Sequence, residues 1–164
     1  MATDSFPRLA ARTMNFSLGV PRGFVVSPDG ARVVFLRAES GTSGVHGMWV
    51  YDVAGRAERQ LVDAAALAGA AESLTAEERA RRERMRVRTA GVVAFSTDHE
   101  VTTAAFALSS RLYVVDLVGD GGVRALPTPI PVVDPQLDPT GQRVAFAGDR
   151  AVHVVDVASG VDRE

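Results

Sequence analysis

The chain contains no cysteine among its 164 residues. This absence excludes disulfide bonds, zinc sites built from thiolates and cysteine nucleophiles, and it fits a reducing compartment. Long apolar runs are also missing, because Arg8, Arg12 and Arg22 interrupt every candidate signal sequence near the N-terminus. No stretch approaches the roughly 20 apolar residues of a membrane-spanning helix. We therefore expect a cytoplasmic protein with no membrane partner.

The chain also has little net charge. Its 18 basic and 20 acidic side chains leave a formal charge of -2, so no basic excess indicates a nucleic-acid partner. Hydrophobic residues make up 46% and charged residues 23%, which is the composition of an ordinary globular protein. The length is that of one domain with a real core.

Motifs for catalysis and cofactor binding are scarce as well. The hydrolase motif Gly-x-Ser-x-Gly has its nearest match at Gly41–Val45, which lacks the last glycine and is better explained as a loop between strands. His46 in a glycine-rich loop, His99 in a turn and His153 in a strand have no metal-ligand spacing. We predict no catalytic, cofactor-binding or metal-ligating residue in this chain.

What the sequence does contain is a repeat. Three segments share one plan, in which a short apolar strand, a polar turn and a β-branched or aromatic strand are followed by a strand that ends in aspartate. The segments are Phe24–Leu61, Val92–Leu126 and Val132–Glu164. The turns are Ser27–Gly30, Ser96–His99 and Asp138–Gly141, and the strand-ending aspartates are Asp52, Asp116 and Asp156. Because catalytic groups are normally used once, aspartates that recur in every repeat indicate a structural role.

The spacing of the repeats indicates propeller blades with one insertion. Asp116 and Asp156 are 40 residues apart, which matches the period of a four-stranded blade, about 40–50 residues. Asp52 and Asp116 are 64 residues apart, so the first period carries an excess of 24 residues. An insertion at about Asp63–Arg88 accounts for that excess.

The insertion has the composition of a helix. It is rich in Ala, Glu and Arg and contains no proline, and Thr75 with Glu78 forms a capping box. One interpretation is a solvated helix that stands off the sheet. The other is an arm whose arginines, Arg81, Arg82 and Arg84 among them, contact a substrate or a partner.

The repeats predict an all-β fold: a partial β-propeller of about three four-stranded antiparallel blades with one helical insertion. The expected segments are an N-terminal lead-in (1–23), three blade-like repeats (24–62, 92–127 and 128–164) and the helical arm (63–91). Propellers close with about 4–8 blades, so three repeats leave an edge and an apolar face uncovered. The chain is therefore expected either to continue in a longer propeller or to close as a homo-oligomer.

These residues resemble bacterial dipeptidyl peptidase IV-like serine peptidases of the prolyl oligopeptidase family. Phe6–Thr13, Phe16–Gly19 and Phe24–Gly30 are similar to the start of the propeller in that family. Leu74–Arg84, followed by Gly91–Ser96, is similar to an arm-like helix that precedes its next blade. The arm is the more diagnostic part, since many propellers contain a Ser-Pro-Asp-Gly turn. The resemblance covers essentially the whole chain.

The resemblance implies an eight-bladed propeller that caps an α/β-hydrolase domain and filters peptide substrates by size. That domain removes N-terminal dipeptides with proline or alanine in second position, through a serine nucleophile. The family's triad and its Asp-Trp-x-x-Glu-Glu-Glu amine-binding motif have no counterpart here, because the one tryptophan, Trp49, is followed by Val-Tyr-Asp. No catalytic or amine-binding residue is therefore transferred to this sequence.

Two hypotheses follow. In the first, the chain is the non-catalytic N-terminal part of the propeller of such a peptidase, and it packs on the C-terminal hydrolase domain and helps to gate peptide substrates. In the second, it is an independent protein-interaction module of propeller repeats that closes by oligomerisation.

Overall fold

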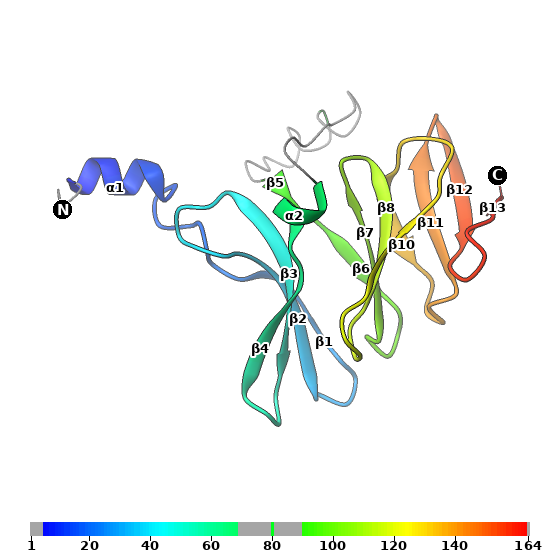
Figure 1. The fold of residues 1–164 in the computed structure, drawn as a ribbon, viewed down its shortest axis with the longest axis horizontal. Coiled ribbons are helices and arrows are strands. Elements are labelled where there is room, and N and C mark those ends of the chain that lie inside the picture. The colour runs from blue at the N-terminus through cyan, green and yellow to red at the C-terminus, as the bar shows by residue number, and fades with distance from the viewer. Residues whose placement is uncertain (1–4, 69–79, 81–89, 164) are drawn as a thin grey trace.

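The structure is a computed structural model that describes residues 5–68, 80 and 90–163. Its strands lie in three sheets (Figure 1). Blade 1 contains β1 (Arg22–Val26), β2 (Arg32–Ala38), β3 (Val45–Asp52) and β4 (Ala57–Val62), with β5 (Ala90–Gly91) beside β3. Blade 2 contains β6 (Phe95–Thr97), β7 (Thr103–Leu108), β8 (Arg111–Asp116) and β9 (Val123–Leu126). Blade 3 contains β10 (Val133–Leu137), β11 (Arg143–Gly148), β12 (Ala151–Asp156) and β13 (Asp162–Arg163).

The four main strands of each blade form an antiparallel meander in which each strand pairs with the next one along the chain, and β5 is added to blade 1 in parallel with β3. The three meanders stand side by side in chain order, with their faces toward one another (Figure 1). The predicted all-β class and the three four-stranded antiparallel blades are therefore confirmed. The third strand of each blade ends at the predicted aspartate: β3 at Asp52, β8 at Asp116 and β12 at Asp156.

A cross-strand aromatic pair recurs at the same register in each blade. Phe35 lies opposite Trp49, Phe106 opposite Tyr113 and Phe146 opposite His153. The last two pairs are stacked, with ring centroids 5.4 and 5.3 Å apart. We call the face that carries this pair the leading face of a blade and the opposite face the trailing face.

The core lies where a trailing face meets the next leading face. The first core joins Val34, Leu36, Met48 and Val50 of blade 1 to Ala104, Phe106, Leu108, Tyr113 and Val115 of blade 2. The second core joins Ala105, Leu112 and Val114 of blade 2 to Val144, Phe146 and Val155 of blade 3. Because side chains alternate along a strand, blade 2 in the middle contributes one set of residues to each core.

The insertion leaves and re-enters blade 1 at one edge of β3. Val62, the last residue of β4, pairs with Met48, and Ala90 of β5 pairs with Val45. Between them, the described part of the insertion begins with the short helix α2 (Ala64–Ala68). The rest of the predicted helical arm, including its capping box, falls outside the described residues apart from Ala80, which is helical. The division of the chain into five segments stays a prediction.

The N-terminal lead-in contains a helix that the sequence analysis did not predict. Helix α1 (Phe6–Arg12) has a proline in its first turn, where the missing N–H costs no hydrogen bond, and none of its residues is buried. It projects beyond blade 1 (Figure 1). Strand β1 begins at Arg22, two residues before the predicted start of the first repeat. None of the described helices is long and apolar enough to cross a membrane.

Candidate functional site

The turns after the first strand of each blade form a continuous row at one end of the molecule, and each is closed by its aspartate. Asp29 accepts a hydrogen bond from the backbone N–H of Ala31, and Asp138 accepts bonds from those of Gln142 and Arg143. Gly30 and Gly141 have positive φ values of 68° and 73°, as tight Asp-Gly and Thr-Gly turns require. These bonds give Asp29 and Asp138 a structural role in their turns.

The middle turn is the best connected of the three. Asp98 is 7% exposed and accepts hydrogen bonds from the backbone N–H groups of Thr102 and Thr103 and from the Thr102 hydroxyl, at 2.7–2.8 Å. Val101 takes the positive φ, 55°, that glycine supplies in the other turns. His99 donates its backbone N–H to the carbonyl of Pro139 in the turn of blade 3, at 3.0 Å.

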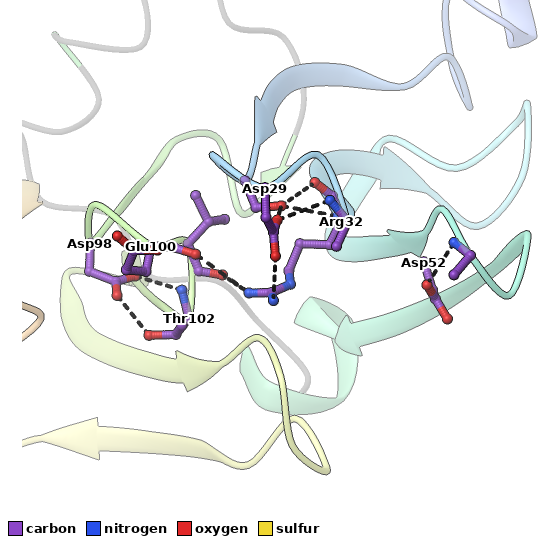
Figure 2. Close-up of polar contacts among 10 residues, drawn as sticks. Asp29, Arg32, Asp52, Asp98, Glu100 and Thr102 are labelled. Carbon is purple, nitrogen blue, oxygen red and sulfur yellow. Dashed lines mark hydrogen bonds and ion pairs between the residues drawn. The ribbon is translucent and has the colours of Figure 1, made fainter.

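Blade 1 reaches the same turn through Arg32. Its guanidinium donates to the carbonyl oxygen of Val101 at 3.0 Å and lies 3.8 Å from the Asp29 carboxylate (Figure 2). Arg32 therefore joins the turn of blade 1 to the turn of blade 2. Together with the His99–Pro139 bond, this contact fixes the relative position of all three blades at this end.

A second set of arginines bridges the blades at their outer strands. Arg59 of β4 lies opposite Val50 and donates to the carbonyl of Gly119 in blade 2 at 3.0 Å. Arg124 of β9 lies opposite Val114 and donates to the carbonyl of Val157 in blade 3 at 2.8 Å. Val50 and Val114 hold the same register position in their blades, so the two arginines are structural equivalents.

The acceptors of these arginines lie in turns that the strand-ending aspartates shape. Asp116 accepts hydrogen bonds from the N–H groups of Gly119 and Val118, which hold the pKa of its carboxyl below the ordinary value. Asp156 accepts from the backbone and hydroxyl of Ser159, which lower its pKa in the same way. These charged acceptors make the turns rigid, so a carbonyl is presented to the preceding blade in a fixed direction.

A groove of about 400 Å³ runs along the outer seam between blades 1 and 2. Arg32, Arg59, Asp52 and Glu58 are among the residues that line it. Both arginines already donate to carbonyls of blade 2. The groove is therefore explained by the packing of two blades, and its polar groups serve that packing.

One partly buried polar pair joins β1 and β3 of blade 1. His46, expected in a loop, is instead a residue of β3 and is 2% exposed, which corrects that expectation. Its Nδ1 lies 2.9 Å from the guanidinium of Arg22 on β1, 24 residues earlier. The glycines around His46 suggested a loop, but Gly47 is required inside the strand, because a Cβ there would collide with the carbonyl of Val62.

Burial and, to a lesser degree, the charge of Arg22 lower the pKa of His46 to about 4. Unfolding returns this pKa to about 6.5, so between pH 6.5 and pH 4 the unfolded chain binds more protons than the folded chain. We therefore expect stability to fall as the pH is lowered through this window, by up to about 3 kcal/mol. Thermal unfolding from pH 7 to pH 4 measures the loss.

The matched variant for that measurement is His46→Asn, whose amide oxygen replaces the acceptor Nδ1 without titrating. The variant is expected to show a clearly smaller loss of melting temperature between pH 6.5 and pH 4. An equal loss in both proteins would contradict the assignment of the pH dependence to His46.

The residues singled out in the sequence are not brought together. Arg81, Arg82 and Arg84 lie outside the described residues. Ser43 lies in the loop between β2 and β3, where its hydroxyl accepts the N–H of Val45, and His153 stacks on Phe146. In the described ranges, no three His, Asp or Glu side chains gather where a metal ion could bind.

The bridging arginines were missed, although the sequence contains a signal for them. An arginine follows the strand-ending aspartate after seven or eight residues in every repeat: Arg59 after Asp52, Arg124 after Asp116 and Arg163 after Asp156. A recurring cation of this kind indicates a contact that is repeated from blade to blade.

Solved structures with this arrangement are β-propellers. TolB from Acinetobacter baumannii aligns with a TM-score of 0.54 and 14% identity over 89% of this chain and 32% of its own length. A putative TolB from Agrobacterium tumefaciens aligns with a TM-score of 0.55 and 13% identity, over 90% of this chain and 47% of its own. The fold is that of a partial, TolB-like β-propeller.

A third neighbour is the dihydro-heme d1 dehydrogenase NirN, with a TM-score of 0.52 and 14% identity over 88% of this chain and 27% of its own. The chain thus spans between a quarter and a half of the length of these proteins. At 13–14% identity the likeness concerns the fold alone. No model of a known protein family matches the sequence.

Proposed function

We propose that the chain forms the first, non-catalytic blades of the propeller of a dipeptidyl peptidase IV-like serine exopeptidase. In this proposal a C-terminal α/β-hydrolase domain, to which the blades dock, cleaves dipeptides from peptide N-termini in the cytoplasm. The blades contribute a rigid wall that admits peptides by size. The chain itself supplies no residue to the acyl-transfer chemistry, which a serine, a histidine and an acid perform in such enzymes.

The proposal rests mainly on the position of the insertion in blade 1. It begins after β4 and ends at β5, and both strands pair with the same edge of β3, so the insertion is an excursion from that edge of an otherwise regular first blade. The arm-like segment Leu74–Arg84 that resembles the family lies within this excursion. A helical arm at this point of blade 1 is what the resemblance requires, and a generic propeller does not require it.

The geometry of the described blades also suits a rigid boundary that encloses the hydrolase site. The two inter-blade cores and the bonds from Arg32, Arg59 and Arg124 hold three sheets together as one body. A rigid body of this kind excludes folded proteins from an enclosed hydrolase site while short peptides diffuse past it. We further propose that Arg81, Arg82 and Arg84 of the arm contact the peptide or a partner chain.

The first experiment isolates the native product from the source cells with an antibody raised against this chain. We expect a polypeptide several-fold heavier than 17.3 kDa that releases p-nitroaniline from an alanyl-prolyl-p-nitroanilide substrate. A fluorophosphonate, which acylates activated serines, is expected to abolish that release. A product of 17.3 kDa with no such activity would overturn the proposal.

The arm is tested in the same heavier product. Replacing Arg81, Arg82 and Arg84 together by glutamine is expected to raise KM several-fold and to leave kcat unchanged, because the change removes binding and no catalytic group. The matched control replaces Arg79, Arg86 and Arg88 of the same segment. An equal effect of both triple variants would attribute the change to overall charge and contradict a specific contact.

A further inference from the structure

We draw no further inference here: the strongest candidate, the apolar surface patch that Phe6 of helix α1 and Phe16 of the following turn form at 72% and 50% exposure, with ring centroids 6.1 Å apart, carries no proposal, because nothing in the structure shows what covers it.

Discussion

Phe106→Ala is expected to lower the free energy of unfolding by about 3–5 kcal/mol, the cost of removing a fully buried phenylalanine from a core. Phe106 has no exposed surface, lies in the core between blades 1 and 2, and stacks on Tyr113. The truncation leaves a cavity at the contact that joins the first blade to the rest. Urea unfolding followed by circular dichroism measures the change.

The matched control is Phe6→Ala in helix α1, where the same ring is 72% exposed. This substitution removes little buried area, and we expect less than about 1 kcal/mol. Similar effects at both positions would mean that Phe106 does not lie between two blades, and the stacking of blade 1 on blade 2 would be wrong.

Gly91→Ala is also expected to have a large effect and to lower the free energy of unfolding by about 2–4 kcal/mol. Gly91 has a φ of 79°, which costs an alanine about 1–2 kcal/mol. An added Cβ would also collide with the backbone carbonyl of His46 and lie 3.0 Å from its backbone nitrogen. Neither of these atoms moves without breaking the pairing of β5 with β3. For a chain of this length the loss corresponds to a melting temperature lower by about 5–15 °C.

Gly44→Ala is the control for Gly91→Ala, since it lies just before β3 and a Cβ there meets no atom within 4 Å. We expect it to be neutral or slightly stabilising. If Gly91→Ala were equally neutral, the insertion would not return to the edge of β3, and the observation that supports the arm would be lost.

The blades could be predicted from the sequence because their signals are local. The Ser27–Gly30 and Asp138–Gly141 turns specify a chain reversal within a few residues, and alternation along a strand specifies which side chains share a face. The strand-ending aspartates recur because each one closes its own turn through nearby N–H groups. Such interactions are visible wherever the residues concerned are close in the sequence.

The contacts between blades could not be predicted in the same way. The burial of His46 depends on Arg22 on another strand, and the role of the Asp98 turn depends on Arg32, whose acceptor Val101 is 69 residues later. Composition also gave one wrong prediction, because the glycines beside His46 indicated a loop. In the structure, Gly47 and Gly91 instead allow neighbouring backbones to approach closely within the sheet. Arg59 and Arg124 could be predicted in part, because their recurrence is visible in the sequence, whereas the carbonyl groups to which they donate could be identified only from the structure.

The stacked arrangement requires the aromatic pairs of blades 2 and 3 to face the trailing face of the blade before each of them. Nuclear Overhauser contacts between assigned ring and methyl protons test this most directly. We expect contacts from the Phe106 ring to methyl groups of Leu36 or Met48, and from the Phe146 ring to methyl groups of Leu112 or Val114. Rings that contact only methyl groups of their own blade would contradict the stacked propeller arrangement.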